Sequence, residues 1–322
     1  MSNFIEDICT KLRTLLERAV KRALTENAGI LLSGGLDTSV LAFVASRYVS
    51  LKAFTVAMQG APAPDLEYSA LMTKRLRLEH HIHCFDTEEM YRTLPSVIKV
   101  LRSFDPMEIR NSLTVYIGIR VAKESGLGTV ITGDGCDELL AGYSFVFWLS
   151  KERLDEELQK LWSVMSFSSI PLAQSLGMEA KLPYLDPEFK SFAMALDSRY
   201  KVGEEGGQRY GKWILRKAYE KSLPREIVWR VKTPIEYGSG TTALPSFFNS
   251  KISDPEFEAK KREYFEGDKV TIRDKEQLFY YEIYRSAVGV PKPTRRGRIC
   301  PQCNSDVQER ATYCRTCGAY PI

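Results

Sequence analysis

The stretch Ile30-Leu31-Leu32-Ser33-Gly34-Gly35-Leu36-Asp37-Thr38-Ser39 decides how this chain is expected to fold. It begins as an apolar run and changes abruptly to Ser-Gly-Gly, followed by one carboxylate and two hydroxyl side chains. This order predicts a buried strand, a glycine turn and the start of a helix. Glycines permit positive φ and close approach of a ligand, and a helix N-terminus attracts anions. We therefore expect a phosphate-binding turn, although it lacks the lysine of a GxxxxGKS or GxxxxGKT loop.

Composition narrows the class of protein. A chain of 322 residues predicts one large domain or two moderate ones. Its 44% hydrophobic and 27% charged residues are typical of soluble globular proteins. The sequence shows no apolar run near the ~20 residues of a membrane span, and residues 1–24 read as an amphipathic helix without the apolar core of a signal peptide. We expect a cytoplasmic protein that makes no membrane contact.

Strand and helix patterns alternate through the first 144 residues. Strands are expected at 28–32, 51–58, 80–85 and 129–132, and helices at 1–24, 37–48, 65–76 and in stretches up to 125. Alternation of this kind predicts a parallel sheet with helices on both faces, whose ligands bind at the carboxyl ends of the strands. After Tyr143 the strand signals fade, and segments such as 151–164 and 211–221 read as helices. The expected organisation is an α/β domain (1–144), a helical remainder (145–290), a linker (291–298) and a cysteine module (299–322).

A second loop follows the last predicted strand, and it reads Ile131-Thr132-Gly133-Asp134-Gly135-Cys136-Asp137-Glu138. Three carboxylates in five residues repel one another unless a cation offsets them. Mg²⁺ on ATP phosphates would be such a cation, and a solvated acidic turn is the alternative. The loop lacks the third glycine of a dinucleotide fingerprint.

Over roughly residues 28–240 the sequence resembles the synthetase half of asparagine synthetases and the related β-lactam synthetases, which are N-type ATP pyrophosphatases. The family's Gly-Glu-Gly-Ser-Asp-Glu loop appears as residues 133–138, and its Gly-Gly-Tyr as Ala141-Gly142-Tyr143. Two further family strings correspond to residues 177–186 (GMEAKLPYLD) and 223–232 (LPREIVWRVK). The resemblance implies an adenine nucleotide alpha hydrolase-like sheet followed by a helical lobe.

The resemblance also implies a reaction and the residues that carry it. ATP would adenylate a carboxylate, aspartate by default, and ammonia or another amine would then attack. Asp37 and Asp137 would ligate Mg²⁺, while Lys232 would neutralise the departing pyrophosphate. Arg110 matches a family arginine near the phosphates, and Asp134 and Glu179 would face the second substrate. Nucleotide contacts are implied for Leu32, Ser33, Gly34, Gly35, Asp37, Thr38, Ser39, Val56 and Gly133.

Three departures from the family pattern change what is expected. Asp134 stands where the family has glutamate, and Cys136 where it has serine. Residue 2 is Ser2, whereas the family's glutaminase needs cysteine after the initiator methionine. We therefore expect the nitrogen to come from ammonia, a separate glutaminase or a different nucleophile.

Four cysteines near the end of the chain are spaced as metal ligands. Cys300 and Cys303 are followed, ten residues later, by Cys314 and Cys317. Two such C-x2-C pairs predict a zinc ribbon, in which four thiolates leave Zn²⁺ no open position and make it structural. A redox dithiol is the alternative.

The same tail is basic. From residue 291 onward six basic residues face two acidic ones, which accounts for the whole net charge of +4. Arg295, Arg296, Arg298 and Arg315 are therefore candidates for RNA contact. An alternative function follows, in which the chain is a tRNA-thiolating ATP pyrophosphatase with Cys136 as sulfur carrier. A non-enzymatic nucleotide sensor is a third possibility.

Overall fold

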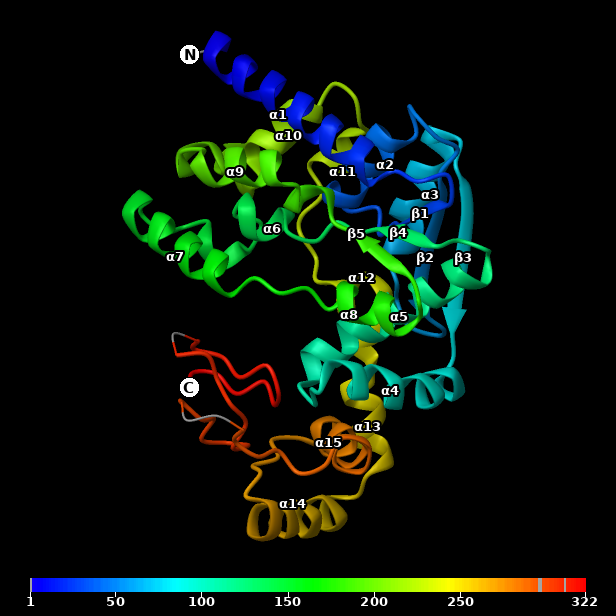
Figure 1. Ribbon diagram of the computed structural model, residues 1–322, viewed down its shortest axis with the longest axis vertical. Coiled ribbons are helices and arrows are strands. Elements are labelled where there is room, and N and C mark those ends of the chain that lie inside the picture. The colour runs from blue at the N-terminus through cyan, green and yellow to red at the C-terminus, as the bar shows by residue number, and fades with distance from the viewer. Residues whose placement is uncertain (1, 295–296, 310) are drawn as a thin grey trace. The chain divides into compact units, whose positions relative to one another are not determined.

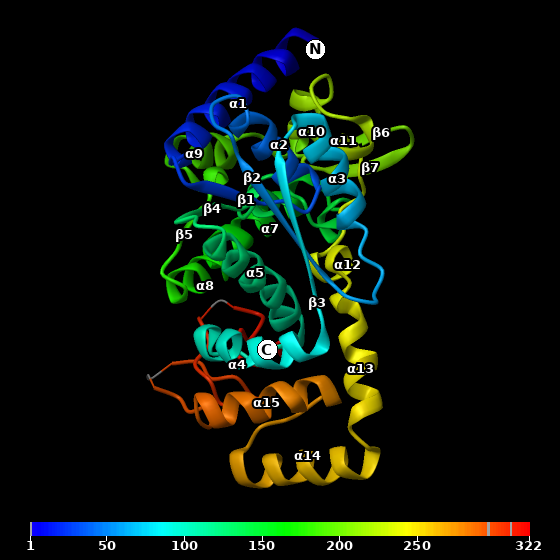
Figure 2. The same cartoon turned by 90° about the vertical axis from the view of Figure 1, so that its right-hand side faces the viewer.

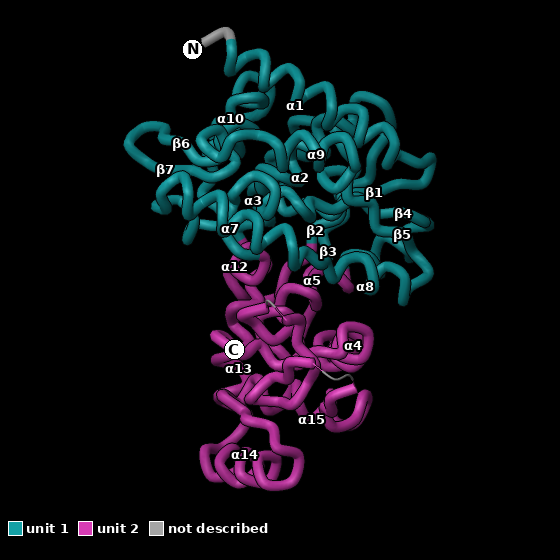
Figure 3. The backbone as a smooth tube through the Cα atoms, turned by 60° about the vertical axis from the view of Figure 1, so that its left-hand side comes forward, with its two compact units in different colours: residues 1–55, 64–83, 118–234 teal, residues 56–63, 84–117, 235–322 magenta. Residues whose placement is uncertain are grey.

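The computed structural model describes residues 2–294, 297–309 and 311–322, so Arg295 and Arg296 lie outside the described residues. The chain divides into two compact units, shown in different colours in Figure 3. Unit 1 comprises residues 1–55, 64–83 and 118–234, and unit 2 comprises residues 56–63, 84–117 and 235–322. Each unit is thus assembled from segments that are distant in the sequence.

A five-stranded sheet has the order β3-β2-β1-β4-β5 (Figure 1). Its strands are β1 (Ala28–Leu31), β2 (Lys52–Met58), β3 (Glu79–Phe85), β4 (Thr129–Ile131) and β5 (Glu179–Lys181). The pairs β1–β2, β1–β4 and β4–β5 are all parallel. The predicted α/β class and four of the strands are therefore confirmed. Strand β5 was not predicted, because its three residues, Glu-Ala-Lys, form no apolar run.

Unit 1 also contains helices. They are α1 (Ser2–Ala23), α2 (Leu36–Ala45), α3 (Asp65–Leu76), α6 (Cys136–Leu139), α7 (Lys151–Val164), α8 (Ser169–Ser175), α9 (Pro187–Ala195), α10 (Trp213–Tyr219) and α11 (Arg225–Val228). Short 3-10 turns lie at Ser144–Val146, Pro183–Leu185 and Ser198–Tyr200. The hairpin of β6 (Val202–Glu205) and β7 (Gln208–Gly211), like β5, was not predicted from the sequence. Helix α1 packs against α2, α9 and α10. Its contact stripe repeats every four residues, because Leu12, Leu16 and Val20 are all fully buried.

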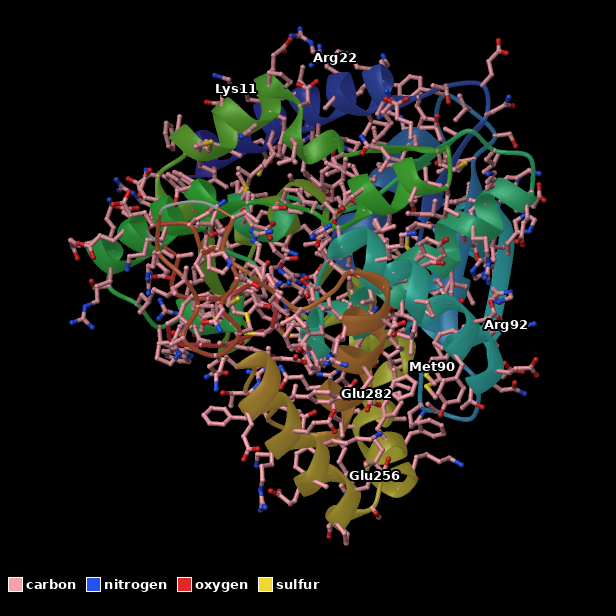
Figure 4. The ribbon with its side chains drawn as sticks, turned by 60° about the horizontal axis from the view of Figure 1, so that its bottom comes forward. Lys11, Arg22, Met90, Arg92, Glu256 and Glu282 are labelled. Atoms are coloured by element: carbon pink, nitrogen blue, oxygen red, sulfur yellow. The ribbon has the colours of Figure 1, made fainter. Side chains whose placement is uncertain are left out.

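Polar contacts fix the end of α1 as well. Arg22, labelled in Figure 4, donates two hydrogen bonds of 2.8 and 2.7 Å to the carboxylate of Asp186 and one of 3.1 Å to Glu188. Asp186 also caps α9, since it accepts from the backbone N–H of Glu188. The end of α1 and the start of α9 are thereby tied to one carboxylate.

Unit 2 is a helical assembly. It contains α4 (Thr87–Leu101), residues 106–117 of α5 (Pro106–Glu124), α12 (Ile235–Ser239), a 3-10 turn (Thr241–Ala243), α13 (Leu244–Lys251), α14 (Asp254–Asp268) and α15 (Lys275–Ala287). Helix α15 packs against α4, α13 and α14, and its place beside α4 is visible in Figure 2. The ring of Phe104 lies 4.9 Å from that of Tyr281 at the centre of this packing. Lys260 on α14 pairs with Glu256 on the same helix and with Glu282 on α15 (Figure 4), and the second pair joins the two helices.

These units differ from the expected ranges 1–144, 145–290, 291–298 and 299–322. Residues 179–181 complete the sheet as β5, so the α/β unit continues past residue 144. Residues 84–117 join unit 2 because α4 packs on α15, nearly two hundred residues further along the chain. Within the described ranges, the helices include none that is both long enough and apolar enough to cross a membrane.

Candidate active site

The glycine turn (residues 33–35) joins β1 to α2, as predicted. Gly34 has φ +67°, and a Cβ placed on it would lie 2.3 Å from the carbonyl carbon of Tyr68 in α3. Only glycine therefore fits this position. The hydroxyl of Ser33 accepts from the backbone N–H of Gly35 at 3.2 Å and lies 3.2 Å from the hydroxyl of Thr38. The turn is thus closed by its own side chains ahead of the helix.

The acidic loop (residues 132–138) follows β4, which pairs directly with β1. A Cβ on Gly133 would meet the Cβ of Asp37 and the methyl group of Thr38 at 3.1 Å. Gly135, with φ +90°, precedes the short helix α6. The two loops therefore pack against each other at the carboxyl edge of the parallel sheet, where ligands bind in such folds.

A charge cluster of four residues, Asp37, Asp137, Lys212 and Lys232, lies at this edge. The ammonium of Lys212 is 2.5 Å from Asp37 Oδ2 and 2.7 Å from Asp137 Oδ1. The ammonium of Lys232 is 2.6 Å from Asp137 Oδ2. The side chain of Lys212 is 3% exposed and that of Lys232 is 32% exposed. The predicted metal ligands and the predicted lysine are thus brought together, with a second lysine between the carboxylates.

The pKa values in the charge cluster follow from burial and pairing. Burial opposes the charge on Lys212, but Asp137 and Asp37 outweigh it and raise the pKa of Lys212. Burial likewise opposes the charge on Asp137, but Lys212 and Lys232 lower its pKa. Opposite charges within hydrogen-bond distance favour the ionised form of both partners. Lys212 and Asp137 are therefore both charged at neutral pH.

Sequence reasoning missed Lys212 and did not explain Gly142. Lys212 has φ +55°, and its backbone N–H donates to the carbonyl of Leu140 at 2.8 Å. A Cβ on Gly142 would lie 1.9 Å from Asp137 Oδ1 and 2.3 Å from the Cε of Lys212. The absent side chain at residue 142 therefore leaves the space in which this ion pair forms. A single lysine after a hairpin strand has no periodicity that could have revealed it.

Arg230 is another residue that the sequence did not single out, although it lies inside the string 223–232. It donates to Asp65 Oδ1 at 2.7 Å and to the carbonyl of Ser33 at 3.2 Å. Its guanidinium carbon stands 3.9 Å from the ring centroid of Tyr68. Burial raises the pKa of Asp65, while Arg230 opposes that shift. Arg230 thus anchors the glycine turn to α3.

The two predicted second-substrate residues are not brought together. Asp134 accepts from the hydroxyl of Thr132 at 2.9 Å and from that of Ser169, and burial raises its pKa. Glu179 is exposed at the first position of β5, in register with Thr129, and its carboxylate pairs with Lys181 at 2.5 Å. It therefore lies at the amino edge of the sheet, ~10 Å of strand away from the acidic loop.

The remaining predicted contacts are distributed over both units. Leu32 is buried, and its N–H donates to the carbonyl of Phe54 at 2.8 Å. Val56 lies two residues further along β2 and belongs to unit 2. Among the described residues, Asp37 Oδ1 and the hydroxyl of Ser39 are buried without a hydrogen-bond partner. Such orphaned oxygens at a glycine turn suit a cation or a ligand hydroxyl.

Arg110 belongs to unit 2 and is already paired there. Its guanidinium donates to Glu236 at 2.5 Å and to Glu276 at 2.6 Å. Burial opposes the charge on Arg110, but Glu276 and Glu236 outweigh it and raise its pKa. Burial raises the pKa of Glu276 to about 7, against the opposing effect of Arg110. A role for Arg110 near phosphates stays a prediction.

The four tail cysteines converge, as their spacing predicts. The Sγ atoms of Cys300, Cys303, Cys314 and Cys317 are buried and all lie within 4.8 Å of one another. Cys300 and Cys317 are 3.6 Å apart and Cys303 and Cys314 are 3.7 Å apart. A tetrahedron with metal–sulfur bonds of about 2.3 Å has edges of about 3.8 Å. The sulfur spacing therefore fits a tetrahedral metal.

Two matching turns carry these cysteines. Asn304 and Gly318, each directly after the second cysteine of its pair, have φ of +59° and +76°. The backbone N–H groups of Asn304 and Gly318 donate to the carbonyls of Cys300 and Cys314 at 2.9 and 2.8 Å. We call residues 300–304 the first knuckle and residues 314–318 the second knuckle.

The fold and the site together define an α/β protein with a parallel sheet and a candidate anion site at its carboxyl edge. The family model described as Asparagine synthase matches residues 11–176 and 171–278. The chain therefore belongs to the asparagine synthase family.

Relatives of this family cover most of the chain. A probable glutamine-hydrolysing asparagine synthetase of Dictyostelium discoideum is 30% identical over 314 residues, which span 87% of this chain and 56% of the relative. A glutamine-hydrolysing asparagine synthetase of Zea mays is 31% identical over 76% of this chain and 45% of its own length. Asparagine synthetase B of Escherichia coli K12 is 28% identical over 87% of this chain and 54% of its own. The chain spans about half the length of the curated relatives it matches.

Proposed function

We propose that this chain is an ATP-dependent amide-forming ligase of the asparagine synthetase type. A carboxylate oxygen of the substrate, aspartate by default, attacks the α-phosphorus of ATP, and the bond to the β-phosphate oxygen breaks. An amine then attacks the acyl carbon, AMP leaves with its oxygen, and the amine loses a proton. The observation that carries this proposal is the charge cluster packed beside the glycine turn, in a chain of the asparagine synthase family.

Mg²⁺ is the cofactor that the family implies beside ATP, and the residues fit it. Asp37 offers a buried carboxylate oxygen without a partner, and Asp137 offers a second carboxylate next to it. Carboxylate oxygens are the ligands that Mg²⁺ prefers, and the ion would offset the charge of the phosphates. Asp37 and Asp137 would hold it.

Other side chains bind and neutralise the phosphates. The N–H groups of the glycine turn, with the hydroxyls of Ser33, Thr38 and Ser39, bind the β- and γ-phosphates. Lys232 is one third exposed and touches a single carboxylate, so its ammonium is able to follow the pyrophosphate as negative charge develops. Arg230 holds the turn in place through the carbonyl of Ser33.

Asp134 is the proposed proton acceptor for the attacking amine. Its pKa is raised by burial, which makes it a stronger base than an exposed aspartate. The hydroxyls of Thr132 and Ser169 hold its carboxylate in one orientation. Glu179, at the other edge of the sheet, has no part in this proposal. Ammonia is the proposed nitrogen donor, free or delivered by a separate glutaminase.

Cys136 bears on the alternative of tRNA thiolation. Its side chain is fully buried, and burial together with Asp37 raises its pKa well above the ordinary thiol value. A sulfur carrier must be reached by its partners and must ionise. The surroundings of Cys136 therefore favour amide formation.

We also propose that the four tail cysteines hold one structural Zn²⁺. Their buried sulfurs, the tetrahedral spacing and the matching knuckles support this, and a closed site of four thiolates leaves no position for a substrate. Metal analysis of the purified chain should find one zinc per molecule. Loss of that zinc in Cys300→Ser is expected, and retention of full zinc content in this variant would contradict the assignment.

A pyrophosphate-release assay tests the proposed reaction. The chain is incubated with ATP and Mg²⁺ and with aspartate plus ammonia, other carboxylates, or total tRNA in separate reactions. We expect release that requires aspartate and an amine, with asparagine as product. Release that requires another carboxylate would keep the ligase class and change the substrate, whereas release that requires only tRNA would overturn the proposal.

A further inference from the structure

The second knuckle is held to the rest of unit 2 through its backbone. Four consecutive carbonyls of this knuckle accept hydrogen bonds of 2.7 Å from unit 2. Ser103 Oγ donates to the carbonyl of Arg315, and the N–H of Phe104 donates to that of Thr316. The carbonyl of Cys317 accepts from both Gln277 Nε2 and Arg273 Nη2, and that of Gly318 accepts from Arg273 Nη1. Because each of these four carbonyls accepts a hydrogen bond from elsewhere in unit 2, the second knuckle is docked on that unit.

The donors come from two helix ends. Ser103 and Phe104 lie three and two residues before the start of α5, whereas Arg273 and Gln277 flank the start of α15. A Cβ on Gly318 would lie 2.1 Å from Asp105 Oδ1, so the knuckle approaches α5 as closely as glycine allows. Asp105 also caps α5 by accepting from the N–H of Glu108 at 3.2 Å. The knuckle thus bridges the N-terminal ends of α5 and α15.

The next contact between these two helices is the ion pair of Arg110 on α5 with Glu276 on α15. Their contact of 2.6 Å involves side chains that are 15% and 3% exposed. Arg110 lies five residues after Asp105, and Glu276 lies one residue before Gln277. The spacing of the two helix ends therefore acts on the Arg110 guanidinium through Glu276, while Glu236 on α12 holds the same guanidinium at 2.5 Å.

The zinc proposed for the four cysteines would help to shape the second knuckle, because two of its ligands, Cys314 and Cys317, lie in it. Inside the knuckle, the N–H of Gly318 donates to the carbonyl of Cys314, and the N–H of Cys314 donates to the carbonyl of the next residue, Ala319, at 3.0 Å. Among the described residues, a turn this short has few hydrogen bonds of its own, and structural zinc supplies folding free energy to such modules. The first knuckle is docked more lightly, since its described contacts to unit 2 are Gln302 O with the N–H of Thr271 and Asn304 with the carbonyl of Lys269.

We propose that the second knuckle is a metal-dependent clasp that joins the N-terminal ends of α5 and α15 and thereby positions Arg110. Arg273 and Gln277 are positioning residues in this clasp, since they act on Arg110 through the knuckle and the helix ends. The last step, an effect of the clasp on ATP use, rests on the proposed function. The clasp itself rests on the zinc proposed for the four cysteines, and not on the proposed reaction.

Hydrogen exchange measured by mass spectrometry on the full chain tests the clasp. Removal of the metal with a chelator should speed exchange about tenfold or more in peptides covering 103–112 and 273–280. Peptides from α1, in unit 1, serve as the internal reference and should not change. Re-addition of Zn²⁺ should restore protection. Equal protection of 103–112 and 273–280 with and without metal would overturn the proposal.

Variants separate the clasp from general loss of folding. Arg273→Met and Gln277→Leu should loosen the same peptides while the chain still holds its zinc, and Arg273→Lys should be intermediate. Arg285→Met removes an arginine from the other end of α15, where it pairs with Asp268, and is the matched control. Loosening by Arg285→Met equal to that by Arg273→Met would contradict a specific clasp.

Activity adds a second readout. If the clasp positions Arg110 for ATP, Arg273→Met should raise the KM for ATP several-fold with a smaller change in kcat. An unchanged KM together with faster exchange would keep the clasp and remove its link to ATP. Absence of pyrophosphate release by the parent chain would instead count against the proposed function and leave the exchange result standing.

Discussion

At the scale of single residues, Lys212 and Lys232 carry the same charge and contact the same carboxylate in different surroundings. Lys212 is buried between Asp37 and Asp137, whereas Lys232 is partly exposed and touches Asp137 alone. A buried lysine that lies between two carboxylates is part of the structure of the site. A lysine with one partner and access to solvent is able to transfer its contact to a leaving group.

Two matched substitutions test this division of roles. Lys212→Met leaves Asp37 without its ion pair and Asp137 with Lys232 alone, so we expect a loss of about 3–5 kcal/mol in the free energy of unfolding. Lys232→Met should cost about 1 kcal/mol or less, yet slow pyrophosphate formation roughly a hundredfold or more. Urea unfolding and steady-state kinetics measure the two quantities. An equal loss of stability in both variants would show that the lysines are not specialised.

Local patterns account for which residues could be predicted. The glycine turn was predictable because one contiguous stretch contains the apolar run, the glycines and the hydroxyls. Lys212 and Arg230 were not, because each owes its role to partners more than a hundred residues away in sequence, such as Asp37 and Asp65. Glu179 was predicted from a family string, but the register of β5 with β4 places it at the edge of the sheet opposite the acidic loop.

At the scale of secondary-structure elements, the register of β5 has a functional consequence. It separates Glu179 from Asp134, two residues that the resemblance assigned to one substrate. We expect Asp134→Asn to lower kcat about a hundredfold or more, as for loss of a general base. Glu179→Gln should leave kcat and the KM for the carboxylate within about twofold. A large loss in Glu179→Gln would mean that β5 does not keep this register during catalysis.

The contact between α5 and α15 predicts a pH dependence of stability. Burial raises the pKa of Glu276 to about 7 from its ordinary value of 4.5, so the folded state holds this proton more tightly than the unfolded state. The free energy of unfolding should therefore fall as the pH rises from about 4.5 to about 7, and level off above that. Urea unfolding at pH 5 and pH 7.5 measures the change. Glu276→Gln should lose this slope, and an identical slope in the variant would assign it to another group.

Elements also differ in how far the sequence predicted them. Helix α3 matches its expected range of 65–76, because its acidic first turn and the glycine- and proline-rich loop before it are local signals. Strand β5 and the hairpin β6–β7 were missed. Strand β5 is three residues long and forms only because β4 offers it a free edge, which is a long-range condition. The length and apolar pattern of residues 179–181 do not reveal such a pairing.

At the scale of the whole molecule, the interleaved chain explains why the expected boundaries differ from the compact units. Sequence reasoning divided the chain into consecutive ranges, whereas unit 2 gathers residues 84–117 and 235–322 around α15. The cysteine tail also belongs to unit 2, through hydrogen bonds of its second knuckle. Composition predicted a basic tail and cysteine spacing predicted its metal site, but the docking of the tail depends on backbone carbonyls, which every residue has.

The central claim for the whole molecule is that it activates a carboxylate as an adenylate. The most direct measurement uses aspartate labelled with ¹⁸O in its side-chain carboxylate, together with ATP, Mg²⁺ and ammonia, and follows the label by mass spectrometry. We expect one ¹⁸O atom in each AMP, because the carboxylate oxygen that attacks the α-phosphorus leaves with AMP when the amide forms. Product formation with the label in inorganic phosphate, or with unlabelled AMP, would contradict it.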